Sequence, residues 1–482
     1  MAWPIHRRLP LAPPIPILAL LALAALLFGA VAFAASSRPR TETRTSDFVT
    51  RAGSRLMLHG RSFRFSGTNI YWLGLDTQDG KTFYPSPFRV DDVLATAREM
   101  GATVVRADTL GMSQGCRLCV EPSLGHFNET ALRHIDYAIK TARADGLRLI
   151  IELVDNWHYA FGGKHTFTDW RGLADETQFF YNPAVIADFE GYIDHLLNHV
   201  NTYTGVAYKD DPTIMAWETG DEITPPVDWT RTIARYLKDV DPHHLVLDGS
   251  RQVDPDGSWH INEHDLSLPT IDLYTDHYYP MSVSQLHRDA SVVRAAHKVF
   301  VVGEYGWSSD PDRENTLERF LAAAQSDPNV AGDLYWSLFG HADTYGYVQH
   351  DDGYTLHYPG DTPDMRRRVE LLRRHAYAMS GTPAPSDERP ATPFITQVAR
   401  PDDHNVLSWR GAAGAAMYSI EASTVGQNGP WKLICSRCAT DTMTPWVDIV
   451  TPVASSEPVW YRVRPYNLSG VPGAVSPVFR AK

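Results

Sequence analysis

The chain contains eight short runs rich in β-branched and aromatic residues, separated by longer amphipathic stretches. This alternation is typical of consecutive strand–helix units around a parallel sheet. The runs occupy residues 63–72, 102–111, 147–157, 213–222, 244–250, 272–280, 298–307 and 332–340. The helical patterns occupy residues 93–100, 129–144, 183–200, 229–240, 284–297, 314–325 and 364–379.

Eight such units predict an α/β fold in which a (β/α)8 TIM barrel spans residues 45–381. No glycine-rich phosphate-binding motif follows the first run, which disfavours an open, doubly wound nucleotide-binding sheet. The composition then changes to a Pro-rich, charged linker at residues 382–393. Residues 394–482 alternate short strands with turn residues, so we expect a small all-β sandwich. This tail resembles a fibronectin type III domain, with Trp409 as its core tryptophan.

The first 36 residues differ from the rest of the chain. Basic residues precede an apolar run at residues 17–35, which predicts a signal peptide, with an uncleaved N-terminal anchor as the alternative. We therefore expect a secreted, extracellular protein. The four cysteines form two local pairs, Cys116 with Cys119 and Cys435 with Cys438. Export favours structural disulfides over the alternative, a zinc site.

The charge and the aromatic content limit the classes of partner. A net charge of -13 disfavours a nucleic acid or an anionic membrane surface, so no membrane partner is expected beyond the N-terminal segment. The 13 Trp and 22 Tyr residues favour carbohydrate, because sugar rings stack on aromatic faces. We expect a neutral polysaccharide substrate, no cofactor and a monomer.

Two glutamates stand where a barrel enzyme carries its chemistry. Glu222 closes the fourth run and Glu304 lies near the end of the seventh, and active sites of such barrels lie at the carboxyl ends of the strands. A retaining glycosidase needs an acid/base and a nucleophile whose carboxyl groups lie roughly 5 Å apart. We expect Glu222 to be the acid/base, protonated in a partly apolar setting, and Glu304 to be the nucleophile, kept ionised by a cation and donors.

Several segments resemble glycoside hydrolase family 5 of clan A, and most of all its endo-β-1,4-mannanase branch. They are FRFSGTNIYWLG, LVDNWHYAFGG, NTYTGVAYKDDPTIMAWETGDEI, TDHYYP and VVGEYGW, and they sample residues 47–380. The resemblance implies that Arg106 is the charge partner of the nucleophile and that His277 and Tyr279 complete its hydrogen-bond shell. It also implies a sugar platform at Trp336 and further substrate contacts at Tyr71, Trp72, Asn156 and Trp157.

One position departs from the family, which usually has Asn-Glu-Pro where this chain has Asp221, Glu222 and Ile223. The resemblance implies a contact with the sugar 2-hydroxyl here, and an ionised aspartate can only accept a hydrogen bond. Three alternatives stay open: the hydroxyl donates to Asp221, Asp221 is protonated, or the substrate has another configuration. A third acid should also raise the pKa of Glu222. Glu218 would share a face with Glu222 on a regular strand, as a supporting acid.

The histidines near the barrel mouth do not have the spacing of metal ligands. His158, His165, His341 and His350 are expected to have surface or substrate-contact roles, and no metal is predicted. The sequence thus predicts a secreted retaining β-glycoside hydrolase that cleaves β-1,4-mannan internally through a covalent glycosyl-enzyme. The alternatives are a hydrolase of another β-glycan, such as a glucan or cell-envelope polymer, and a carbohydrate-binding pseudoenzyme.

Overall fold

A computed structural model describes most of the chain after residue 46. The described residues are 47–78, 80–255, 257–307, 316–350, 352–386, 388–399, 405–441, 447–449 and 458–481. The predicted signal peptide or anchor at residues 1–36 lies outside them. Within these ranges, no helix combines the length and the apolar character needed to cross a membrane.

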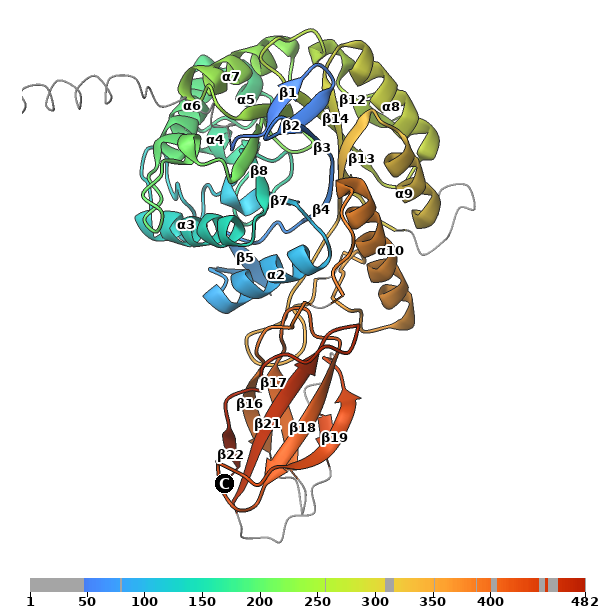
Figure 1. The fold of residues 1–482 in the computed structure, drawn as a ribbon. Coiled ribbons are helices and arrows are strands. Elements are labelled where there is room, and N and C mark those ends of the chain that lie inside the picture. The colour runs from blue at the N-terminus through green and yellow to red at the C-terminus, as the bar shows by residue number, and fades with distance from the viewer. Residues whose placement is uncertain are drawn as a thin grey trace, which may run out of the picture. The chain divides into compact units, whose positions relative to one another are not determined.

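Eight parallel strands form a closed barrel, shown in Figure 1. Each strand pairs with its neighbours in chain order, and the last pairs with the first, so the sheet has no free edge. The strands are β4 (Phe65–Asn69), β7 (Val104–Ala107), β8 (Arg148–Glu152), β9 (Ile214–Glu218), β10 (Leu245–Asp248), β13 (Leu273–Tyr278), β14 (Val299–Tyr305) and β15 (Val330–Tyr335). Each predicted run contains or overlaps one of these strands, so the predicted TIM barrel is confirmed.

Helices connect the strands and cover the barrel. They are α2 (Pro87–Glu99), α3 (Glu129–Ala144), α4 (Lys164–Trp170), α5 (Gln178–Tyr181), α6 (Pro183–Asn198), α7 (Val227–Val240), α8 (Val283–Ala295), α9 (Leu317–Ser326) and α10 (Pro363–Ser380). Local sequence explains several helix starts: the side chains of Asn128 and Asn182 accept hydrogen bonds from backbone N–H groups of α3 and α6. The left-handed Gly381, with φ of 68°, ends α10.

A short antiparallel sheet closes one end of the barrel. It consists of β1 (Thr50–Ala52), β2 (Arg55–Leu58) and β3 (Arg61–Phe63). Leu56 of this sheet packs in one apolar cluster with side chains such as Val104, Leu273 and Val299, which begin their strands. Apolar side chains therefore close the barrel at the amino ends of the strands. A site on the barrel axis is expected at the carboxyl ends.

The C-terminal residues form two antiparallel sheets around a core of their own. One contains β16 (Phe394–Ala399), β17 (Asn405–Arg410) and β20 (Val447–Ile449); the other contains β18 (Met417–Ser423), β19 (Lys432–Ala439), β21 (Val459–Tyr466) and β22 (Phe479–Ala481). Trp409 is buried in the core of this part beside Tyr418, as predicted. The described residues of the predicted linker, 382–386 and 388–393, contain no helix or strand.

The two predicted cysteine pairs are disulfide-bonded, Cys116 with Cys119 and Cys435 with Cys438.

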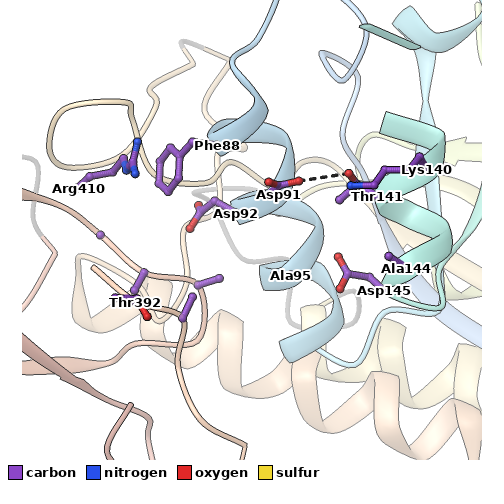
Figure 2. Close-up of a pocket in the computed structure, with 14 residues that line it drawn as sticks. Phe88, Asp91, Asp92, Ala95, Lys140, Thr141, Ala144, Asp145, Thr392 and Arg410 are labelled. Atoms are coloured by element: carbon purple, nitrogen blue, oxygen red, sulfur yellow. Dashed lines mark hydrogen bonds between the residues drawn. The ribbon is translucent and has the colours of Figure 1, made fainter. Parts of the chain in front are cut away.

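Figure 2 shows a hollow lined by α2, α3 and residues 391–392 and 410–413. Thr141 donates to Asp91 across it at 3.2 Å, and the guanidinium of Arg410 lies 4.0 Å from the centre of the Phe88 ring. None of its lining residues belongs to a barrel strand, so it does not carry the predicted chemistry.

His341 lies beside this region, and its predicted surface or substrate-contact role is wrong. Its ring is buried, with Nδ1 2.9 Å from Asp92 and Nε2 3.0 Å from Asp441 of the C-terminal part. Asp441 also accepts a hydrogen bond from Tyr418. His341 is therefore a structural residue that joins barrel and C-terminal side chains.

Candidate active site

A pocket of about 390 Å³ opens at the carboxyl ends of the barrel strands. Both predicted catalytic glutamates, Glu222 and Glu304, lie in its wall. The other lining residues are Asp108, Asp155, Trp157, Tyr159, Asp221, Trp259, Tyr279, Trp336, His350, Asp352 and Tyr354. The pocket therefore combines carboxyl groups with aromatic faces, the two residue types that a glycoside-cleaving site needs.

Arg106 of β7 lies beneath the pocket, 1% exposed, and organises its acids. Its Nη1 donates to Oε1 of Glu304 at 2.7 Å, and Nη2 donates to Oδ1 of Asp221 at 2.6 Å. Two further bonds, Nε to Oε2 at 2.7 Å and Nη2 to Oε1 at 3.0 Å, hold Glu218 in a bidentate pair. The structure thus brings together Arg106 and Glu304 as predicted, and it places Glu218 behind the pocket as a supporting acid.

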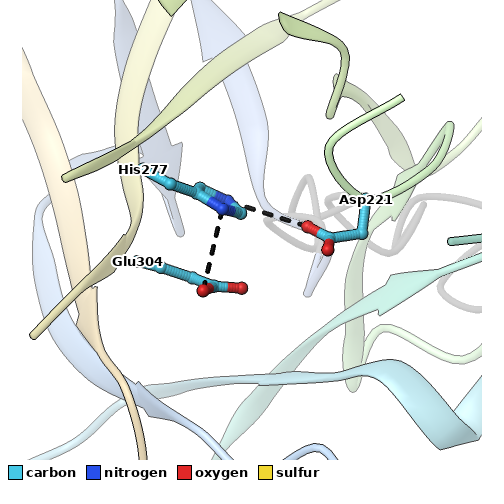
Figure 3. A group of neighbouring side chains, drawn as sticks. All are labelled: Asp221, His277 and Glu304. Atoms are coloured by element: carbon cyan, nitrogen blue, oxygen red, sulfur yellow. Dashed lines mark ion pairs between the residues drawn. The ribbon is translucent and has the colours of Figure 1, made fainter. Parts of the chain in front are cut away.

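His277 contacts both predicted catalytic carboxyl groups, those of Glu222 and Glu304. Figure 3 shows its ion pairs with Glu304 and with Asp221. Its Nδ1 is 3.0 Å from Oε1 of Glu222 and 3.7 Å from Oε2 of Glu304, and its Nε2 is 3.8 Å from Oδ1 of Asp221. Burial alone would lower the pKa of His277, but these three carboxylates raise it to about 10. The imidazolium form is therefore favoured at neutral pH.

Glu222 does not lie on a regular strand, because β9 ends at Glu218. The backbone of Glu222 is left-handed, with φ of 50°, which is uncommon for a residue with a side chain and is found at functional sites. This turn directs the carboxylate to Trp157, whose Nε1 donates to Oε2 at 2.8 Å, and to Arg251, whose Nη1 lies 2.9 Å from Oε2.

The protonation states expected for the two glutamates are reversed in this ligand-free geometry. Burial alone would raise the pKa of Glu222, but the bond to His277 and the charge of Arg251 lower it to about 2. Burial, with the negative charges of Asp221 and Glu222, raises the pKa of Glu304 to about 8 against the opposing pull of His277 and Arg106. The difference arises because Glu304 faces the negative charges of Asp221 and Glu222, whereas His277 and Arg251 lie 3.0 Å and 2.9 Å from oxygens of Glu222.

The other predicted residues divide into those that reach the pocket and those that do not. Tyr279 donates its hydroxyl to Oε2 of Glu304 at 3.1 Å, and Trp336 lines the pocket with its Nε1 bonded to Asp352 at 2.7 Å. Tyr71 is buried and stacks on Trp336 at 5.8 Å, so it supports that platform. Asn156 lies outside the lining, where Oδ1 accepts from Lys164.

The predicted subsite role of Trp72 is wrong. Its side chain is fully buried, packs against Phe339 and lies 4.5 Å from the guanidinium of Arg89. No sugar can reach it without unfolding this part of the wall.

Several residues in or beside the pocket were not predicted from the sequence. Trp259 lines the pocket, and Arg251 pairs with Glu222 beside it. Both come from the hairpin of β11 (Arg251–Val253) and β12 (Trp259–Ile261), where the Arg251 guanidinium lies 3.0 Å from the Trp259 ring centre. Nothing in their local sequence points to the pocket. Asp108 and Asp155 could have been found from the sequence, because Asp108 directly follows β7 and Asp155 comes three residues after the end of β8.

Two groups of side chains have a geometry that could hold a metal ion. Asp221, His277 and Glu304 form one group, and Asp108, Glu152 and Asp155 form the other, with the ligand atoms of each group within 4.8 Å of one another. In the first group Arg106 and His277 already supply positive charge. The second group has one contact with a cation, between Oε1 of Glu152 and Arg106 at 3.1 Å.

With this geometry established, the comparison with known proteins decides the family. Residues 46–305, more than half of the chain, match the family described as GH family 5 beta-mannosidase-like. The chain belongs to this family. It is accordingly a glycosyl hydrolase.

Relatives and solved structures agree with this membership. Mannan endo-1,4-beta-mannosidase 4 of Solanum lycopersicum is 30% identical over 369 residues, which cover 66% of this chain and 89% of the relative. The endo-1,4-beta-mannanase of Rhizomucor miehei has a TM-score of 0.59 and 27% identity over 70% of this chain and 100% of its own. The endo-1,4-beta-D-mannanase of Thermotoga petrophila has a TM-score of 0.56 and 27% identity over 65% and 99%, respectively.

Proposed function

We propose that this family 5 hydrolase cleaves β-1,4-linked mannan internally, with retention of configuration, through a covalent glycosyl-enzyme on Glu304. The observation that carries the mechanism is the position of one nitrogen, Nδ1 of His277, within 3.0 Å of a Glu222 oxygen and 3.7 Å of a Glu304 oxygen. Such proximity supports a retaining pair, whose carboxyl groups lie roughly 5 Å apart, over the wider inverting pair.

In the first step, an oxygen of Glu304 attacks the anomeric carbon while the bond to the leaving oxygen breaks. Glu222 gives its proton to that oxygen, and an ester joins the sugar to Glu304. In the second step, water attacks the same carbon, Glu222 takes a proton from the water, and the ester breaks to free Glu304. Arg106 and Tyr279, which donate to Glu304, stabilise its carboxylate before attack and after release.

The proton that Glu222 needs has a nearby source. At rest, His277 is the protonated partner and Glu222 the anion of a 3.0 Å hydrogen bond. Transfer along this bond gives neutral His277 and protonated Glu222, the form that can act as acid. The pKa of Glu304 is raised to about 8, so Glu304 also carries a proton at neutral pH. Passing that proton to the neutral His277, whose Nδ1 is 3.7 Å away, restores the imidazolium and gives the Glu304 carboxylate that attacks.

The choice of mannan rests on the relatives, whose names state mannan endo-1,4-beta-mannosidase activity. Trp336 and Trp157 line the pocket and would provide stacking faces, and Trp157 is 41% exposed. The proposal includes export of the chain by residues 1–36 as signal peptide or anchor. It also includes a fibronectin type III-like tail that acts as a spacer.

The mechanism is tested by trapping. An activated 2-deoxy-2-fluoro-β-mannoside should label the wild-type protein, and peptide mass spectrometry should find the sugar on Glu304. The Glu222→Ala variant should lose at least 100-fold in kcat on mannan, and azide should restore turnover of a substrate with a good leaving group, giving a β-azide product. Glu370→Ala, at an exposed position of α10, is the matched control. Labelling at another residue, or full activity of Glu304→Ala, would overturn the assignment.

A further inference from the structure

One sheet of the C-terminal part is basic, although the chain as a whole is acidic. The sheet consists of β18, β19, β21 and β22 (Figure 1). These strands contain one acidic residue, Glu421, and five basic residues: Lys432, Arg437, Arg462, Arg464 and Arg480. The net charge of the chain is -13. We call the side of this sheet that is turned away from the C-terminal core its outer face.

Strand β21 contributes a row of side chains to the outer face. Side chains of a strand alternate between its two sides. Three alternate residues of β21 lie in the C-terminal core: Val459, Tyr461 and Val463. The others point outward and are partly exposed: Trp460, Arg462, Arg464 and Tyr466. Two arginines are thus flanked by two aromatic rings along roughly 20 Å of strand.

Neighbouring strands extend this mixture of guanidinium groups and rings. Arg480 of β22 stands opposite Trp460 in the register of the two strands. Three arginines lie against rings, with guanidinium-to-centre distances of 5.7 Å for Arg480 and Trp460, 4.6 Å for Arg437 and Tyr466, and 4.3 Å for Arg462 and Trp431. Stacking on a ring restricts an arginine side chain while leaving its N–H groups free to donate.

Most of the positive charge on the outer face has no acidic partner. Arg462 pairs with Glu421. Within the described ranges, no carboxylate oxygen lies within 4.0 Å of a side-chain nitrogen of Arg437, Arg464 or Arg480. Arg437 and Arg464 each donate one long hydrogen bond to a backbone carbonyl, at 3.5 Å and 3.4 Å. Because a guanidinium has five N–H donors, most of this donor capacity is available to a ligand.

The chemistry of the outer face fits a sugar polymer that carries carboxylates. The planar fork of arginine matches a carboxylate, and aromatic faces stack on sugar rings. The barrel of the same chain is a glycosyl hydrolase, so polysaccharide is the polymer this protein meets. The active-site pocket is unsuited to an anionic polymer, because six of its lining residues carry carboxyl groups and none is Lys or Arg.

We propose that the outer face of this sheet binds an anionic polysaccharide whose sugars carry carboxylate groups, through Arg437, Arg464, Arg480 and the ring of Trp460. The C-terminal part then holds the hydrolase on an acidic matrix while the pocket takes a neutral chain. This adds a binding role to the spacer role proposed above.

Two hexamers that differ only at C6 of each sugar test the proposal. The β-1,4-mannuronate hexamer has a carboxylate where mannohexaose has a hydroxymethyl group. Calorimetry uses the full chain with Glu222→Gln, so that neither hexamer is cleaved. At low salt and pH 7, the mannuronate hexamer should bind even when excess mannohexaose is present. Its affinity should fall at least 10-fold in about 0.5 M salt, because the contacts are exposed and ionic.

Matched variants locate the binding. Arg464→Gln with Arg480→Gln should weaken binding of the mannuronate hexamer at least 10-fold. Arg367→Gln with Arg374→Gln removes the same charge from exposed positions of α10 and should leave it unchanged. Trp460→Ala should weaken binding about fivefold through the lost stacking. Thermal unfolding reports whether each variant is folded, and Arg480→Gln alone is the milder test on the last strand.

Four results would overturn the proposal. They are no binding of the mannuronate hexamer, equal losses in the two double variants, displacement by mannohexaose, which would place the ligand in the pocket, and tighter binding of a thymidine heptanucleotide, which would identify a nucleic-acid surface. None of these results depends on whether the barrel cleaves mannan, so failure of this inference and failure of the proposed function are distinguishable.

Discussion

His277 and Glu222 form a 3.0 Å hydrogen bond in which the imidazole, with its pKa raised to about 10, holds the proton. The acid/base is therefore deprotonated at rest, and the working protonation state requires a transfer within the site. Because the charges of the pair are coupled to those of Asp221 and Glu304, each pKa observed in kinetics belongs to the group as a whole.

Replacing His277 by Gln should shift the bell-shaped dependence of kcat/KM on pH to higher pH. The cation lowers the pKa of both Glu222 and Glu304, so both rise when it is removed. The rate at the optimum should fall about 100-fold, since the proton source is also lost. His287→Gln, at an exposed ion pair with Asp327, is the control. An unshifted pH profile would contradict the role given to His277.

Arg251→Met should affect one limb of the same profile. The guanidinium lowers the pKa of Glu222 but is not among the principal influences on Glu304. The limb that reports Glu222 should therefore move to higher pH while the other limb stays within the error of measurement. Arg288→Met removes an exposed arginine that pairs with Glu263 and serves as the control. Movement of both limbs would show that Arg251 acts through the whole cluster.

Two substitutions of Arg106 should separate charge from geometry. Lys retains the charge but cannot reproduce the fork that binds Glu218, Asp221 and Glu304 together, so kcat should fall about 100-fold with a small change in stability. Met leaves the buried acids without their cation, and the free energy of unfolding in urea should fall by about 3–5 kcal/mol. A fully active Lys variant would show that the fork geometry is dispensable.

His341 should make stability depend on pH above neutrality. Burial alone would lower its pKa, but Asp92 and Asp441 raise it to about 10, against about 6.5 in an unfolded chain. A raised folded-state pKa contributes stability that is complete below about pH 6.5 and lost as pH rises to about 10. The wild-type Tm should therefore fall more between those values than that of His341→Gln, which is less stable at pH 7. Parallel Tm curves would contradict this account.

The barrel and the catalytic glutamates were predictable because their signals are local. Alternating short apolar runs and amphipathic stretches specify strand–helix units, and a carboxylate after a buried strand is hard to explain as packing. Glu222 and Glu304 were found in this way. Trp72 and Trp157 could not be told apart, since both are tryptophans that close a run. Only the path of the following loop decides that Trp72 is buried and Trp157 is 41% exposed.

The protonation of the site was not predictable, because it depends on contacts between residues far apart in the chain. Arg251 comes from a hairpin after the fifth strand, β10, and meets Glu222 because β9 and β10 pair side by side in the barrel. His341 similarly meets Asp441, 100 residues away. Sequence patterns carry no information on such distances, and electrostatic energies vary steeply with them.

Sequence patterns were enough to predict a (β/α)8 barrel followed by β-strands, with two glutamates at strand ends. Periodicity and strand-end position suffice for that, since they follow from the backbone geometry of helices and strands. The fold in three dimensions places the charges: Arg251 and His277 contact Glu222, while Arg106 and His277 contact Glu304. Their energies depend on burial and distance in three dimensions, which the folded barrel alone fixes.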